Sequence, residues 1–209
     1  LKPQEDEFIL MGMAAWGKQD DDLQSIMYND FFGFDADLKL RKNLHKGCMD
    51  YEPSIYPDNG TEQWKFDIAA NVQTICEWQI QKVFKKAKEL VPETDNMCYS
   101  GGVALNCVAN SLVVEKQYPN MWILPNPGDA GSSLGCAAYV NGKHLDFMEN
   151  GAFLGYNIKG DYPVKPVLKE LLKGNLVGVA NGRAEYGPRA LGNRSLLADP
   201  RGKDIKAQM

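Results

Sequence analysis

Apolar residues recur at helical spacing in one long segment of the first half of the chain. From Asp67 onward the intervals are three or four residues, and the positions concerned are Ile68, Val72, Ile75, Trp78 or Gln79, Val83 and Ala87. This spacing predicts an amphipathic helix with Asp67 as its N-cap. Lysines at 82, 85, 86 and 88 lie on the other face or in the last turns, where they suit the negative end of the helix dipole.

Two strand, glycine-turn and helix units follow Pro92. "MCYS" predicts a strand and runs into "GGVALNCVANSLVVEK", which we expect to become helical past its glycines. "MWILP" predicts a second strand, followed by the turn and helix of "NPGDAGSSLGCAAYV". Two such units in succession are typical of an α/β domain with ligand chemistry at the carboxyl ends of its strands.

The remaining segments give weaker patterns. We expect strand or loop for "GMAAWG" (12–17) with the apolar residues 8–11 before it, and short strands between Met27 and Tyr56, around Phe31, Phe32, Phe34, Leu38 and Leu40. A turn-rich connector (155–166), a short helix (167–173) and the strand "NLVGVAN" complete the reading. It predicts one domain over residues 1–157 and the start of a second over 158–209.

Composition places the chain among ordinary globular proteins. Of its 209 residues 44% are hydrophobic and 24% charged, and no apolar run is long enough to cross a bilayer. With a polar, acidic start and no signal peptide, a cytoplasmic protein is the expectation. The net charge of −4 argues against general nucleic-acid binding. Five cysteines without a CxxC pair support neither a zinc knuckle nor a disulfide framework.

Two glycine-rich turns carry candidate chemistry. "SGGVALN" (100–106) joins a strand to a helix, where backbone N–H groups favour an anion and Gly101 and Gly102 allow close approach. A turn made for packing alone is the alternative, and the segment departs from the standard dinucleotide and P-loop motifs. In "GDAGSSLG" (128–135), Asp129 either binds a metal or caps the next helix through the amides of Gly131 and Ser132, and spacing alone favours the cap.

The most polar stretch is "GRAEYGPRALGNRS" (182–195). Its three arginines, Arg183, Arg189 and Arg194, carry forked guanidinium groups suited to phosphate or carboxylate, and its glycines and proline fix the bends of the loop. Residues 182–209 hold six basic and three acidic side chains inside an acidic chain, which favours an anionic small ligand. The alternative is a solvated loop whose arginines pair with Glu185 and Asp199.

Three motifs together indicate a family. "SGGVALNCVAN", "PGDAGSSLGCAA" and "GRAEYGPRALGNRSLLADPR", in this order and spacing, resemble the O-carbamoyltransferases of antibiotic and nodulation-factor biosynthesis, and "MGMAAWGK" and "DIAANVQ" add two weaker matches. The resemblance implies an α/β protein: the second half of an actin-like (ribonuclease H-like) ATPase domain, then the start of a domain similar to threonylcarbamoyl-adenylate synthases. The second domain would form carbamoyl-adenylate from carbamoyl phosphate and ATP, and the first would transfer the carbamoyl group to a hydroxyl acceptor.

The resemblance also implies roles for individual residues. Gly101, Gly102 and Asn106 would line the nucleotide pocket of the transfer site, and Asp129 would bind a divalent metal ion, Fe²⁺ or Mg²⁺. The carbamoyl phosphate and ATP pocket would be lined by Arg183, Tyr186, Arg189, Arg194 and Ser195, with Arg189 and Arg194 acting in catalysis.

Two departures from the family bear on activity. Ile9 stands where the family usually has lysine, and the amino-terminal half of the actin-like domain, with the histidine pair of the metal site, is not in the sequence. We therefore expect a fragment of a cytoplasmic carbamoyltransferase with little activity alone, and a homodimer is possible. The alternatives are a non-catalytic binding or dimerisation module and an actin-like-fold kinase, which would phosphorylate its acceptor instead of releasing AMP and pyrophosphate.

Overall fold

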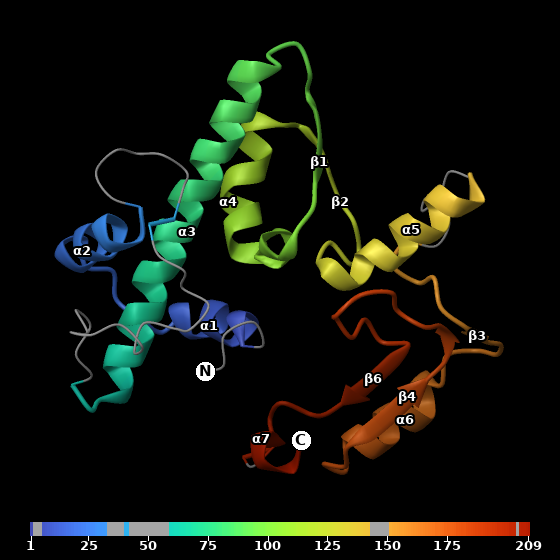
Figure 1. Ribbon diagram of the computed structural model, residues 1–209. Helices are drawn as coiled ribbons and strands as arrows, with labels where there is room; N and C mark the ends of the chain where they lie inside the picture. Colours follow the sequence, from blue (N-terminus) through green and yellow to red (C-terminus); the bar gives the residue numbers. More distant parts are fainter. Residues whose placement is uncertain (2–5, 33–39, 42–58, 143–150, 204) are drawn as a thin grey trace. The chain divides into compact units, whose positions relative to one another are not determined.

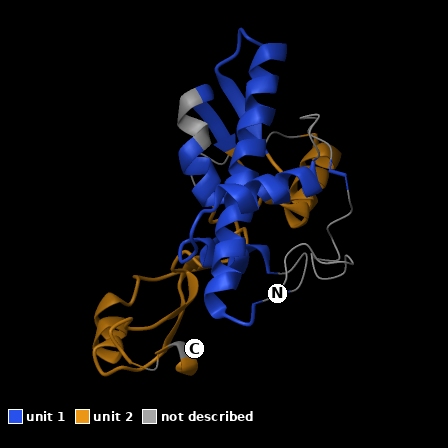
Figure 2. Ribbon diagram, turned by 90° about the vertical axis from the view of Figure 1, so that its left-hand side faces the viewer, with its two compact units in different colours: residues 1–99, 103–122 blue, residues 100–102, 123–209 orange. Residues whose placement is uncertain are grey.

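A computed structural model describes residues 1, 6–32, 40–41, 59–142, 151–203 and 205–209 (Figure 1). The chain divides into two compact units (Figure 2). Unit 1 comprises residues 1–99 and 103–122, and unit 2 comprises residues 100–102 and 123–209. No helix among the described residues is long and apolar enough to span a membrane.

Unit 1 is organised around one long helix, α3 (Glu62–Leu90). Helices α1 (Glu7–Ala14), α2 (Asp21–Phe31) and α4 (Cys107–Gln117) pack against it (Figure 1). Strands β1 (Asn96–Tyr99) and β2 (Asn120–Ile123) pair with each other, and η3 (Gly102–Leu105), a short 3₁₀ turn, leads from β1 toward α4. The first strand, glycine-turn and helix unit predicted after Pro92 is therefore confirmed, and so is the strand of the second.

Helix α3 begins five residues before the predicted N-cap. Thr61 is the N-cap, and its Oγ1 accepts a hydrogen bond from the backbone N–H of Trp64 at 3.2 Å. Asp67 lies inside the helix, where its carboxylate accepts from the backbone N–H of Lys18 at 2.8 Å. The prediction was wrong because an aspartate that holds a distant loop has the same sequence signature as a cap.

The buried face of α3 changes along its length. Its first half packs Ile75 against Met27 and Phe31 of α2. Its second half packs Ile80 and Phe84 against residues of α4 and of the segment just before β2. Val83 and Trp78, predicted for the buried stripe, are 45% and 40% exposed. Because different elements cover the two halves, no single stripe of three- and four-residue intervals describes the whole helix.

The prediction of strand or loop for residues 8–14 and of short strands from Met27 to Phe31 was wrong, whereas residues 15–17 form the loop that the sequence allowed. Residues 8–14 lie in α1, consistent with the good helix formers Leu and Met in this segment. Met27 and Phe31, expected in short strands, lie four residues apart on the buried side of α2, whose N-cap Asp20 accepts from the N–H of Leu23. The strands expected around Phe34, Leu38 and residues 42–56 fall outside the described residues.

Unit 2 combines short helices with small sheets. Its helical elements are η4 (Asp129–Gly131), α5 (Ser132–Asn141), α6 (Val164–Leu171) and α7 (Ile205–Gln208). Strands β3 (Asn157–Ile158) and β5 (Gly182–Arg183) pair antiparallel, as do β4 (Val177–Ala180) and β6 (Arg194–Leu197), with Val179 opposite Ser195. Helix α6 begins three residues before the predicted start, and the strand within "NLVGVAN" is confirmed as β4.

This mixture of helices and two-stranded sheets is compatible with the predicted α/β class. The boundary predicted between residues 157 and 158 stays a prediction.

Candidate functional site

The two glycine-rich turns meet inside unit 2. The carbonyl of Pro127 accepts hydrogen bonds from the backbone N–H of Gly101 at 2.8 Å and from the Ser100 hydroxyl at 3.1 Å. A cavity of about 260 Å³ opens beside them, and it is lined by Ser100, Leu124, Pro127, Gly128, Gly131, Ser132, Leu134 and Gly135. The sequence placed candidate anion binding on the first turn and a candidate metal ligand on the second, and residues of both turns line this one cavity.

The glycines of these turns serve different physical needs. Gly101 has a backbone φ of +109°, which side chains rarely tolerate, although a Cβ there would meet open space. Gly102 has open space and an ordinary φ. At Gly131 a Cβ would lie 1.8 Å from the carbonyl oxygen of Asn126, so only glycine permits this close approach. Gly101 and Gly131 are therefore required by the backbone, whereas the structure would accept a side chain at Gly102.

Asp129 does not cap the helix that follows it. The N–H of Gly131 donates to the carbonyl of Gly128, and the N–H of Ser132 donates to the carbonyl of Asp129. The Asp129 carboxylate is exposed and accepts no hydrogen bond from the described residues. The capping alternative is therefore not realised. Among the described residues no three His, Cys, Asp or Glu side chains cluster as a metal site would require.

The arginine-rich stretch forms a loop closed by a carboxylate. Glu185 Oε1 accepts backbone hydrogen bonds from Leu191 at 2.9 Å, Asn193 at 2.8 Å and Arg194 at 3.1 Å. Partial desolvation raises the pKa of Glu185, but these amides and its own N–H outweigh that effect and lower the pKa to about 2. Glu185 is thus a fixed anion that gathers the backbone of residues 191–194, and we define residues 185–194 as the arginine loop.

Two predicted ligand-binding residues also hold this loop. Arg194 donates through Nη1 to the carbonyls of Asn181 at 2.9 Å and Asn193 at 2.7 Å, and through Nη2 to those of Tyr156 at 3.0 Å and Gly182 at 3.3 Å. Ser195 is buried, and its hydroxyl accepts from the N–H of Gly192 at 2.9 Å. In this structure both side chains are engaged with the backbone; their contact with a ligand stays a prediction.

The other two arginines are more available. Arg189 is exposed and has no partner among the described residues, while Arg183 is exposed and reaches only the carbonyl of Gly155, at 3.5 Å. Neither pairs with a carboxylate of the described residues. Asp199 instead binds Arg201, with 2.6 Å between Nη2 and Oδ2, and this hydrogen bond lowers the pKa of Asp199 to about 2. The ion pairs with Glu185 and Asp199 that the sequence left open for these arginines are therefore absent among the described residues, although both arginines are exposed to solvent.

Tyr186 connects the loop to the glycine turn. Its hydroxyl donates to the carbonyl of Gly131 at 3.2 Å, and its backbone N–H donates to the carbonyl of Ala152 at 2.6 Å. A Cβ at Gly187, whose φ is +142°, would lie 2.6 Å from the carbonyl oxygen of Pro125. The arginine loop thus lies against the glycine turn that carries Asp129, within unit 2.

Asn106 lies in unit 1 and is held from α3. Its amide exchanges two hydrogen bonds with Gln73, at 2.9 and 3.1 Å, and its Oδ1 also accepts from the N–H of Ala109 at 3.0 Å, which caps α4. Whether Asn106 also contacts a nucleotide stays a prediction. Sequence reasoning missed Gln73 and Glu185 as supporting residues, although both lie inside quoted motifs, because their partners are backbone or amide groups that no spacing rule reveals.

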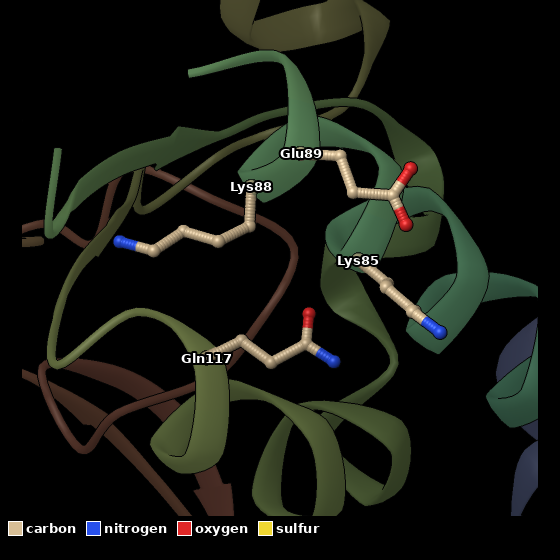
Figure 3. A pocket seen from close by; sticks show the side chains of 4 residues that line it. All are labelled: Lys85, Lys88, Glu89 and Gln117. Atoms are coloured by element: carbon tan, nitrogen blue, oxygen red, sulfur yellow. The ribbon is translucent and has the colours of Figure 1, made fainter. Parts of the chain in front are cut away.

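A second cavity, of about 400 Å³, lies in unit 1 and is lined by Lys85, Lys88, Glu89 and Gln117. Figure 3 shows Lys88 and Glu89 leaving α3 in opposite directions, with Gln117 projecting from α4. Lys88 is already engaged, since it donates to Asp95 at 3.1 Å and lies over the ring of Tyr118. Lysines at the end of α3 complement the helix dipole, so the fold accounts for this cluster without a ligand.

Comparison with known proteins agrees with the motifs in both units. Residues 1–138 match the family model for the carbamoyltransferase N-terminus, and residues 168–209 match that for the carbamoyltransferase C-terminus. The chain is 33% identical over 92% of its length to a 3'-hydroxymethylcephem-O-carbamoyltransferase of Amycolatopsis lactamdurans, covering 39% of that protein. It is 35% identical over 90% of its length to nodulation protein U of Rhizobium tropici, covering 37% of it, and 30% identical over 97% to a Synechocystis protein, covering 40% of it.

The chain thus spans about two fifths of the length of these curated relatives. The amino-terminal model alone matches well over half of the chain. Together with the motifs, these matches show that the chain belongs to the carbamoyltransferase family.

Proposed function

We propose that this chain contributes two neighbouring sites of an O-carbamoyltransferase that uses ATP. One site, at the arginine loop, forms carbamoyl-adenylate from carbamoyl phosphate and ATP. The other, at the cavity beside Ser100 and Gly128, takes part in moving the carbamoyl group to the hydroxyl of a small-molecule acceptor. Family membership and the relatives named for O-carbamoyl transfer support the reaction class, and an actin-like fold for the first domain is part of the proposal.

The observation that carries the proposal is a contrast within residues 183–195, between side chains that are bonded to the backbone and two arginines that stay exposed. The side chains of Glu185, Arg194 and Ser195 form hydrogen bonds with backbone groups. The loop is thereby held in shape while Arg189 and Arg183 keep exposed guanidinium groups without carboxylate partners. Held and unpaired, they can donate in bidentate fashion to phosphate oxygens.

This arrangement suits formation of a mixed anhydride. Several negative oxygens must be held together while pyrophosphate leaves ATP, and positioned guanidinium groups stabilise the charge that develops on them. In the proposal Arg189 is the catalytic arginine that touches the phosphates. Arg194 donates to backbone carbonyls, and in the proposal it holds the loop in the conformation that positions Arg189.

The proposed divalent metal fits the chain only in part. Asp129 offers an exposed carboxylate at the cavity's own turn, and oxygen ligands suit Mg²⁺ and are accepted by Fe²⁺. The described residues offer no group of three His, Cys, Asp or Glu side chains, so in the proposal further ligands come from outside these residues. When bound, such an ion polarises a carbonyl and stabilises a leaving phosphate.

The proposal is tested by titrating the chain with carbamoyl phosphate in a calorimeter. Replacing Arg189 with alanine removes a charge-assisted contact of about 1.5–3 kcal/mol, so we expect the dissociation constant to rise roughly 10- to 150-fold. Lys169→Ala is the matched control, because Lys169 is an exposed cation on α6 of the same unit.

Equal affinity in the Arg189→Ala and Lys169→Ala chains would overturn the proposal. We expect no turnover of carbamoyl phosphate by the chain alone, and binding is therefore the informative measurement. A phosphorylated acceptor in assays of a longer protein, in place of AMP and pyrophosphate, would instead favour a kinase.

A further inference from the structure

Two motifs that the sequence assigns to different pockets are joined by a hydrogen bond. The Tyr186 hydroxyl donates to the carbonyl of Gly131 at 3.2 Å across 55 positions of sequence. Beside it Gly187 approaches the carbonyl of Pro125 so closely that a Cβ would lie 2.6 Å from that oxygen. The arginine loop thus rests directly on the turn of residues 125–131, which we name the aspartate turn.

The aspartate turn leaves little room for independent movement. Gly131 is buried, its N–H is bonded to the carbonyl of Gly128, and the space for a Cβ is filled by the carbonyl of Asn126. It ends the short η4 turn that Asp129 begins, and it lines the 260 Å³ cavity. A displacement of the Gly131 carbonyl therefore moves the cavity wall and the backbone that carries Asp129.

The loop side of the contact is equally constrained. Tyr186 follows Glu185, whose carboxylate gathers the backbone of residues 191–194, and its own N–H is bonded to Ala152. A ligand that pulls on the Arg189 side of the loop therefore shifts a closed ring of hydrogen bonds rather than one side chain. Tyr186 is the side chain by which that ring reaches the aspartate turn.

We infer that Tyr186 is a positioning residue that couples oxyanion capture by the arginine loop to the geometry of the aspartate turn. Phosphate bound at the loop acts through the Tyr186 hydroxyl on the Gly131 carbonyl, and occupancy of the cavity acts back on the loop, since such coupling is reciprocal. Tyr186 then touches the turn rather than the phosphate. The inference rests on the proposed function, because it requires that the loop bind a phosphate group.

Inorganic phosphate is the probe, titrated into the ¹⁵N-labelled chain while backbone amide shifts are followed by NMR. In the native chain we expect shifts at Leu191–Asn193 in the loop and at Gly128 and Gly131 in the turn, with one dissociation constant. In Tyr186→Phe the loop shifts should persist and the turn shifts should fall several-fold. Tyr156→Phe is the control, because that side chain is 82% exposed and its hydroxyl has no partner among the described residues.

Each outcome bears on a distinct claim. If phosphate shifts no loop amide, the proposed function fails and the coupling fails with it. If phosphate shifts the loop amides of the native chain but not its turn amides, the coupling is wrong while the proposed function stands. This comparison needs the native chain only. Turn shifts of equal size in Tyr186→Phe and Tyr156→Phe would also overturn the role of Tyr186.

Discussion

Asn71 is the residue whose replacement tests the architecture of unit 1 most directly. Its side chain is fully buried and makes four hydrogen bonds. Oδ1 accepts from the N–H of Asp20 and from Nε2 of Gln24, both at 2.9 Å, while Nδ2 donates to the carbonyls of Lys18 at 3.1 Å and Asp67 at 2.8 Å. Through these bonds α3 holds the segment between α1 and α2.

Replacing Asn71 with alanine leaves two hydrogen-bond donors, the Asp20 N–H and the Gln24 amide, without their acceptor. Gln24 as a residue is only 3% exposed, and the hydrogen bond of the Asp20 N–H is partly buried. An unsatisfied buried group costs about 1–3 kcal/mol. With two such groups, the free energy of unfolding of unit 1 should fall by about 2–6 kcal/mol. Gln81→Ala on the exposed face of the same helix should change it by less than about 0.5 kcal/mol.

Urea unfolding followed by tryptophan fluorescence measures this difference. All four tryptophans of the chain, at positions 16, 64, 78 and 122, lie in unit 1, so the signal reports that unit alone. If Asn71→Ala and Gln81→Ala unfolded with the same midpoint and slope, the assignment of Asn71 as the residue that holds this segment would be wrong.

Two further predictions concern the site in unit 2. Because hydrogen bonds lower the pKa of Glu185 from its ordinary 4.5 to about 2, its stabilisation of the loop is complete above pH 4.5 and is lost as the pH falls toward 2. Amide hydrogen exchange at Leu191 and Asn193 should accelerate over that pH interval. In Glu185→Gln the exchange should be fast already at pH 6. Unchanged exchange would show that the Glu185 carboxylate does not protect these amides. Gly101→Ala should destabilise unit 2 by about 1–3 kcal/mol because of its positive φ, whereas Gly102→Ala should be nearly neutral; equal thermal shifts would contradict the backbone argument.

The parts of the fold that the sequence predicts are those set by local chemistry. Glycine turns between short apolar runs mark β1, β2, α4 and α5, and Gly142, in the left-handed conformation at φ +61°, ends α5 as a C-cap glycine should. The extent of α3 and the nature of α1 were predicted wrongly because contacts with distant residues decide them. The Asp67 carboxylate accepts a hydrogen bond from the backbone N–H of Lys18. Gly17 lets the segment after α1 lie against α3, because a Cβ at Gly17 would be 1.9 Å from the carbonyl oxygen of Phe66.

The candidate site follows the same division. The sequence singles out the arginines by residue type and charge, and all three belong to unit 2. The sequence alone does not distinguish Arg189 from Arg194. In the structure Arg189 has no partner among the described residues, whereas Arg194 donates four hydrogen bonds to carbonyls 1 to 38 positions away in sequence. That difference depends on where the backbone returns, and only the folded chain determines it.

The closed ring around Glu185 has a thermodynamic consequence for any ligand of this loop. Because the conformational entropy of residues 185–194 is lost when the chain folds, capture of an anion does not have to order them again. Weak ligands such as single phosphate groups can therefore be held by few contacts, and association should not wait for a slow rearrangement of the loop.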